Sequence, residues 1–283
     1  MHRLIAQSGR LSYLCAVVVI LSGFASLEAL FAPKAELWER WAANDPNSTI
    51  VVNHDAWNRF LQLYVKADNS GLNQVDYARV SKADSQVLHT YLQALRKVPV
   101  SHLKRTEQRA YWINLYNALT VRLIIDYYPV KSIQDIDLDT GLFSSGPWGK
   151  KLIRVEGELL SLNDIEHRIL RPIWKDPRLH YAVNCASVGC PDLQSRAFNA
   201  TNTEVMLDSA AAAYINSSRG AMMIDGALVA SKIYLWFQDD FGGSDSAVLA
   251  HLKKYANAGL TRDLSTVTEI ADYAYDWTLN ATQ

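Results

Sequence analysis

The sequence has little cysteine, glycine or proline and no excess of either charge, and each shortage excludes a class of protein. Three Cys, 13 Gly and 8 Pro among 283 residues are too few for a disulfide-dense or collagen-like chain. Lys and Arg number 28 against 29 Asp and Glu, so the basic footprint of a nucleic-acid binder is missing. With 49% hydrophobic and 20% charged residues, the composition is that of a folded globular protein.

Familiar catalytic motifs are also missing. The sequence contains no Walker A, G-x-S-x-G, H-E-x-x-H or Rossmann fingerprint. Cys185, Cys190, His167 and His180 match no standard zinc-ligand spacing. We therefore expect no metal and no cofactor.

Long apolar runs are confined to the N-terminus. Arg3 and Arg10 precede an apolar stretch over residues 11–25, and small residues follow it, a pattern typical of a secretory signal. Extended to Ala32, the stretch approaches the roughly 20 residues that span a bilayer. We expect residues 1–32 to be a signal peptide or an N-terminal membrane anchor of an exported, periplasmic bacterial protein. Only this segment would contact a membrane.

The remaining residues, 33–283, are expected to form a single α+β domain in which helices pack with β-hairpins. Apolar periodicity predicts a set of helices at 54–66, 82–97, 101–128, 164–171, 203–216 and 246–257. Ser101 is the expected cap of the longest helix. Hairpins are predicted over 151–162 and 221–234, with turns at Glu156-Gly157 and Asp225-Gly226.

Cys185 is the strongest candidate for chemistry. It ends a predicted strand over 179–185 and precedes a Ser/Gly/Pro turn, so a loop would expose a rigidly held thiol. A nucleophilic Cys needs a base; His167 is the candidate, because His180 would lie on the opposite strand face. Three alternatives stay open: a Cys185–Cys190 disulfide, a redox couple of the two, or an inert buried thiol.

Two amides mark the aromatic helix 101–128. Asn114 and Asn117 lie three residues apart and therefore share one helix face. Buried amides need hydrogen-bond partners. They either fix a neighbouring loop or orient a catalytic group or a substrate.

Three segments, 111–118, 161–171 and 176–191, resemble the domain of unknown function 547 family in motif, order and spacing. The likeness covers about residues 100–220 and carries no activity with it. It implies that the following positions belong to the family pattern: Trp112, Asn114, Tyr116, Asn117, Glu166, His167, Leu170, Arg171, Arg178, Cys185, Ser187 and Pro191. The pattern is looser at Cys190, where Ser is frequent, which weakens the disulfide alternative.

The order of His167 before Asn184-Cys185 is similar to that in permuted papain-like or transglutaminase-like thiol enzymes, an analogy of fold alone. It suggests a thiol-dependent hydrolase or acyltransferase in which Cys185 attacks an acyl carbon and His167 is the base. Glu166 or Asn117 would orient that base. The expected substrate-binding residues are Trp112, Asn114, Tyr116, Arg178 and Ser187. The competing hypothesis is a non-catalytic periplasmic binding or scaffold module, with a peptide, acyl or glycan ligand and a Cys185–Cys190 disulfide.

Overall fold

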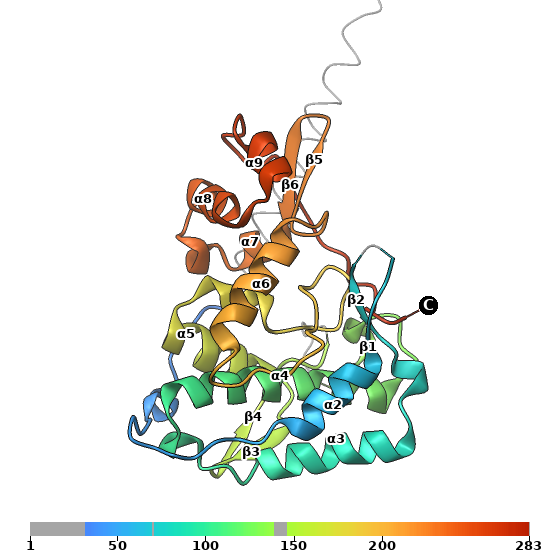
Figure 1. Cartoon of the computed structure of the whole chain (residues 1–283), viewed down its shortest axis with the longest axis vertical. Coiled ribbons are helices and arrows are strands. Elements are labelled where there is room, and N and C mark those ends of the chain that lie inside the picture. The colour runs from blue at the N-terminus through green and yellow to red at the C-terminus, as the bar shows by residue number, and fades with distance from the viewer. Residues whose placement is uncertain (1–31, 70, 139–145, 283) are drawn as a thin grey trace, which may run out of the picture.

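The protein is described by a computed structural model over residues 32–69, 71–138 and 146–282 (Figure 1). The predicted signal peptide or anchor lies, apart from residue 32, outside these residues. Helices make up 49% and strands 11% of the described residues, which confirms the predicted α+β class. Within the described ranges, no helix is long and apolar enough to span a bilayer.

The elements follow one another in small units rather than in one large sheet. The α-helices are α2 (Asp55–Tyr64), α3 (Lys82–Leu95), α4 (Arg105–Tyr127), α5 (Arg171–Trp174), α6 (Thr203–Ile215), α7 (Lys232–Trp236), α8 (Asp245–Tyr255) and α9 (Ala258–Leu264). The strands are β1 (Val65–Ala67), β2 (Asn73–Val75), β3 (Ile153–Val155), β4 (Glu158–Leu160), β5 (Ala221–Ile224), β6 (Ala227–Ser231) and β7 (Asp272–Ala274). Short 3-10 helices are η1 (Glu39–Ala42), η2 (Tyr77–Arg79), η3 (Val100–His102), η4 (Ile133–Asp135), η6 (Pro177–Tyr181) and η7 (Gln238–Phe241), and η5 (Asp164–Leu170) is a π-helix.

The predicted helices and hairpins are confirmed, with changes at their ends. α2, α3, α6 and α8 lie within two residues of their expected bounds. The longest helix begins at Arg105, and Ser101 does not cap it: its hydroxyl donates to Glu156 Oε1 at 2.8 Å. Both hairpin turns have the predicted residues at positive φ, as type I′ turns require. The expectation of hairpin pairing alone is incomplete, because β7 pairs parallel to β6.

The predicted strand over 179–185 is wrong. Residues 177–181 form η6 instead, and Asp176 caps it by accepting from the Arg178 amide. Pro177 at the first helical position favours that start. Residues 182–186 then form an irregular loop, because side-chain amides rather than a β-ladder take up the backbone hydrogen bonds of this loop.

The π-helix η5 is tied to the segment that follows the predicted leader. Pro172 lacks the N–H that would bond the carbonyl oxygens of His167 or Arg168 from the next turn. Those two carbonyls accept instead from the amides of Glu36 and Trp38, at 2.9 and 3.0 Å. The Arg168 guanidinium also lies 4.4 Å from the Trp38 ring centroid. Residues 33–38 thus form a strap across η5.

Two apolar clusters make up the interior. The larger cluster surrounds the central helix α4, whose residues 107–121 are all buried. It also includes side chains from α2, α3 and η5. The smaller lies among α6, α8 and the β5–β6–β7 sheet, the upper part of Figure 1. The loop after η6 lies at their junction: Tyr181 belongs to the smaller cluster and Ala182 to the larger. The C-terminal segment also links them, since Asn280 N–H donates to the Ala186 carbonyl at 3.0 Å.

Candidate functional site

Cys185 lies in the loop between η6 and α6, at the junction of the two clusters. Its Sγ is 3.0 Å from the Tyr275 hydroxyl and 3.3 Å from Ser187 Oγ. The two hydroxyls are themselves 2.9 Å apart. Cys185 as a residue is half-buried, so it is held in place by its neighbours and is still partly exposed to solvent.

Cys190 lies directly beside it as a second, buried thiol. The Cys185 amide donates to Cys190 Sγ at 3.0 Å. Cys190 is 5% exposed, and both cysteines are free thiols in the structure. The site is therefore an asymmetric pair in which Cys185 is partly exposed and Cys190 is enclosed.

Hydrogen bonds make the two thiols differ in acidity. A hydrogen bond from Cys190, with others from Ser187 and Tyr275, lowers the pKa of Cys185, although burial and the Glu166 charge act in the other direction. Burial, followed by its interactions with Cys185, raises the pKa of Cys190 well above its usual range. Burial also raises the pKa of Tyr275, so its hydroxyl remains a donor. The thiolate therefore forms at Cys185, the partly exposed member of the pair.

Side-chain amides hold the loop in which the thiol lies. Asn117 Nδ2 donates to the Ala182 carbonyl at 2.8 Å, and its Oδ1 accepts from the Asn184 amide at 2.8 Å. Asn184 in turn accepts from the Ala186 amide at 2.9 Å. These bonds stabilise Ala186 at φ 60°, a left-handed conformation that costs an alanine roughly 1 kcal/mol. Asn117 acts here as a clamp on the loop, not as a partner of His167.

Tyr275 completes the site from far along the chain, and the sequence did not identify it. Its neighbours contact the Cys loop closely at Gly189, whose amide donates to the Asp276 carbonyl at 2.8 Å. A Cβ at Gly189 would lie 2.6 Å from the Asp276 nitrogen, so only glycine permits this approach. The one signal in the sequence was the aromatic character of residues 272–280.

An aromatic group surrounds the Tyr275 ring. Its centroid is 4.9 Å from that of Trp236 and 4.7 Å from that of Trp277, and Trp277 is 5.7 Å from Trp148. All four side chains are half-buried. The tyrosine hydroxyl at the thiol is thus fixed by ring packing rather than by a flexible loop.

The predicted partner His167 is directed elsewhere. Its Nδ1 is 3.0 Å from Arg171 Nη1, and it makes no hydrogen bond to Cys185. Arg171 and His180 bind Asp240 Oδ2 at 2.5 and 2.6 Å. Burial opposes the ionisation of Asp240, but these two bonds outweigh it and lower the pKa of its carboxyl to about 2. The described residues thus contain a buried ionic cluster of His167, Arg171, His180 and Asp240, apart from the thiol site.

Glu166 lies between the two groups. Its carboxylate is 4.0 Å from His167 Nδ1, and its charge acts on Cys185. It also lies beside Tyr116: burial, and then the Glu166 charge, raise the pKa of Tyr116 well above its usual range. Glu166 therefore disfavours the Cys185 thiolate rather than activating it.

Of the remaining predicted substrate-binding residues, Trp112, Asn114 and Arg178 contact groups other than the thiol. Tyr116 is buried near enough to Cys185 and Cys190 for their charges to add to the effect of burial and raise its pKa. Trp112 is fully buried, 5.0 Å from Trp41 between ring centroids. Asn114 uses both ends of its amide on the Phe198 backbone. Arg178 lies in an open pocket and binds Asp176 and Asp208. The structure thus brings Ser187 to Cys185, with Asn117 beneath the loop.

No group of His, Cys, Asp and Glu in the described residues is arranged to hold a metal ion. The groups that the thiol site offers are the partly exposed Cys185, the buried Cys190 and the hydroxyls of Ser187 and Tyr275.

The structure combines helices with small sheets, so the chain is an α+β protein. The loop that carries Cys185 is held within this fold by Asn117. Residues 100–215 match the model of the family described as protein of unknown function, DUF547. Residues 100–215 are therefore a domain of this family, as predicted from the three motifs. No curated protein and no solved structure matches the chain. The matched segment contains both cysteines but not Tyr275.

Proposed function

We propose that this chain is an exported thiol–disulfide exchange protein in which Cys185 is the attacking thiol and Cys190 the resolving thiol. The observation that carries the proposal is the asymmetry of the pair: the amide of the half-buried Cys185 donates to the Sγ of the buried Cys190, and the pKa of Cys185 is lowered while that of Cys190 is raised. Exchange requires a thiolate and access to it, but no general base. Export through residues 1–32 would place the pair where disulfides persist.

The exchange has two steps. The Cys185 thiolate attacks one sulfur of a substrate disulfide; the S–S bond breaks, and the departing substrate thiolate takes a proton from water. The Cys190 thiol then gives its proton to water and attacks Cys185 Sγ. The Cys185–Cys190 disulfide forms as the second substrate thiol leaves. The substrate disulfide is reduced by two electrons, and the protein dithiol is oxidised by two.

The acidity of Cys190 supports this order of events. Its interactions with Cys185 contribute to its raised pKa. A mixed disulfide at Cys185 carries no negative charge, so the Coulombic part of that effect disappears once the substrate is attached. Loss of that charge lowers the pKa of Cys190 and makes its thiolate easier to form after the first step, although burial, the largest cause of the raised pKa, remains.

A second candidate, the thiol-dependent hydrolase or acyltransferase of papain-like type, is favoured by one observation. Ser187 and Tyr275 place two hydroxyl donors within 3.3 Å of Sγ, where they would contact an acyl oxygen. Its weakness is the base, because His167 is hydrogen-bonded to Arg171. Exchange needs no such base, and we prefer it.

The test is a single turnover of the reduced full chain with hydroxyethyl disulfide, followed by residue-resolved mass spectrometry. Exchange predicts that Cys190→Ser accumulates a mixed disulfide on Cys185, that the unchanged chain ends as the Cys185–Cys190 disulfide, and that Cys185→Ser does neither. With p-nitrophenyl acetate, the acyl mechanism predicts turnover that survives Cys190→Ser and is lost in Cys185→Ser. A Cys185–Cys190 disulfide that resists mild reductant would refute both and favour the scaffold module.

A further inference from the structure

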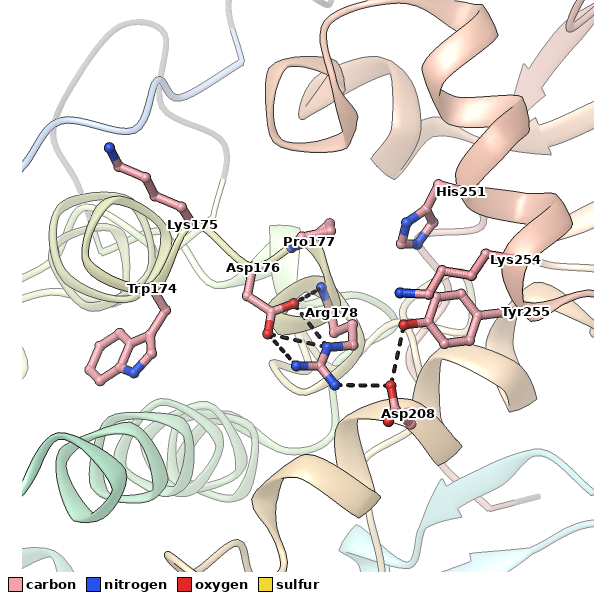
Figure 2. Close-up of a pocket in the computed structure, with 9 residues that line it drawn as sticks. All are labelled: Trp174, Lys175, Asp176, Pro177, Arg178, Asp208, His251, Lys254 and Tyr255. Carbon is pink, nitrogen blue, oxygen red and sulfur yellow. Dashed lines mark hydrogen bonds and ion pairs between the residues drawn. The ribbon is translucent and has the colours of Figure 1, made fainter.

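A pocket of about 670 Å³ opens on the side of the molecule formed by α8, α6 and the segment joining α5 to η6. Figure 2 shows the two walls: His251, Lys254 and Tyr255 on α8 face the Asp176–Arg178 segment across the opening. None of these residues takes part in the proposed thiol chemistry. The volume is within the range of small-molecule sites, roughly 300–1,000 Å³.

One wall is a closed ionic network. Arg178 donates to Asp176 at 2.7 Å, to Asp208 at 2.9 Å and to Glu204 at 2.7 Å. Arg109 binds Asp176 from behind. The carboxylates of this wall therefore have cationic partners already. Of the five guanidinium N–H groups of Arg178, one on Nη1 remains for a ligand.

The other wall carries a lysine that forms no salt bridge within 4.0 Å among the described residues. His251, Lys254 and Tyr255 are spaced i, i+3 and i+4 on α8 and so share one face. Lys254 Nζ lies 5.0 Å from the Tyr255 ring centroid, and its charge also helps to lower the pKa of Asp208. Figure 2 shows its ammonium directed across the opening.

His251 is a fixed neutral neighbour of that ammonium. Its Nε2 is 2.9 Å from the Tyr181 hydroxyl, and its ring packs on Phe241 and Tyr255. Burial, and then the Lys254 charge, lower the pKa of His251 to about 4. The second ring nitrogen is left for a ligand.

We infer that this pocket binds a small organic monocarboxylate, with its carboxylate at Lys254 and the adjoining His251 ring. One ammonium and one neutral imidazole suit a single negative charge. On the facing wall the three carboxylates of Asp176, Glu204 and Asp208 share only the two guanidinium groups of Arg109 and Arg178, and the remaining negative charge would repel a dianion such as a phosphate monoester more than a monoanion. The body of the ligand would lie against Tyr255 and Pro177, which also line the pocket.

The experiment measures binding of N-acetyl-phenylalanine to the full chain by calorimetry, with its neutral amide as the matched ligand. We expect saturable binding of the acid and none of the amide. Lys254→Met should weaken binding tenfold or more, since it removes a charge-assisted contact. Lys253→Met removes the same charge from an exposed position on the same helix that does not line the pocket. This change should leave the binding of the acid unchanged.

An independent readout is the His251 ring in NMR. A carboxylate beside it favours the protonated imidazole, so the ligand should raise the titration midpoint of His251, and the acid should bind more tightly as pH falls. Absence of saturable binding, equal binding of acid and amide, or equal weakening by the Lys253 and Lys254 changes would each overturn the proposal. Thermal melting of both variants checks that the fold is intact.

Discussion

Tyr275→Phe tests the origin of the Cys185 acidity most directly. The change removes one hydroxyl, 3.0 Å from Sγ, and keeps the ring among Trp236 and Trp277. A hydrogen bond to a charged group contributes about 1.5–3 kcal/mol, so its loss lowers the thiolate fraction about 10- to 100-fold at a pH below the thiol pKa. Because a more basic thiolate is a better nucleophile, with a Brønsted coefficient of about 0.4–0.5, the net fall in alkylation rate is about 3- to 10-fold.

The assay is iodoacetamide labelling of Cys185, read peptide by peptide across a pH series. Tyr273→Phe is the matched control: it removes a tyrosine hydroxyl two residues away that donates to Asp245 at 2.8 Å, and it should leave the rate unchanged. At high pH, where Cys185 is ionised in both proteins, Tyr275→Phe should label about 3- to 10-fold faster than the unchanged chain, because its thiolate is more basic and therefore more nucleophilic. An unchanged or faster rate at neutral pH, with an intact melting transition, would refute the role assigned to Tyr275.

Three further predictions concern stability. Asn117→Ala leaves the buried Asn184 N–H and Ala182 carbonyl without their hydrogen-bond partners. It should lower the free energy of unfolding, measured by urea denaturation, by about 2–5 kcal/mol. The control Asn58→Ala should lower it by about 1 kcal/mol. Gly189→Ala places a Cβ 2.6 Å from the Asp276 nitrogen and should cost about 1–3 kcal/mol while slowing Cys185 labelling; unchanged labelling would contradict the close approach. Burial lowers the pKa of His167 to about 4, whereas a histidine in the unfolded chain has a pKa of about 6.5. Between these two pH values the unfolded chain binds one more proton than the folded chain. The free energy of unfolding therefore decreases as pH falls, by up to about 3 kcal/mol. His167→Gln should remove this part of the slope in denaturation curves, whereas the exposed His89→Gln should keep it.

Local sequence was sufficient where short-range physics decides the structure. The apolar spacing of Trp57, Phe60, Leu61 and Tyr64 predicted α2, and all four are buried. Glu156-Gly157 and Asp225-Gly226 predicted both hairpin turns, because few residue pairs accept two positive φ angles. Three motifs identified the family, and the same motifs contained Cys185 and Asn117.

Predictions from the sequence were wrong where a partner far along the chain decides the structure. The apolar run 179–185 has strand character, yet Pro177 and the Asp176 cap start a 3-10 helix, and the Asn117 amide holds the loop that follows. His167 lies on the helix that precedes Cys185, but its ring contacts Arg171 instead of the thiol. The distant Asp240 binds the guanidinium of Arg171 and so fixes this arrangement. Spacing along the chain carries no information on such pairings.

The sequence by itself determined the composition class, most helices, both hairpins, the family and the candidate cysteine. These follow from periodicity, turn chemistry and motifs, which act over a few residues. Only the tertiary structure decided which groups surround that cysteine. Tyr275 lies 90 residues further along the chain, and it reaches Sγ because Gly189 lets the C-terminal segment pack directly against the Cys loop.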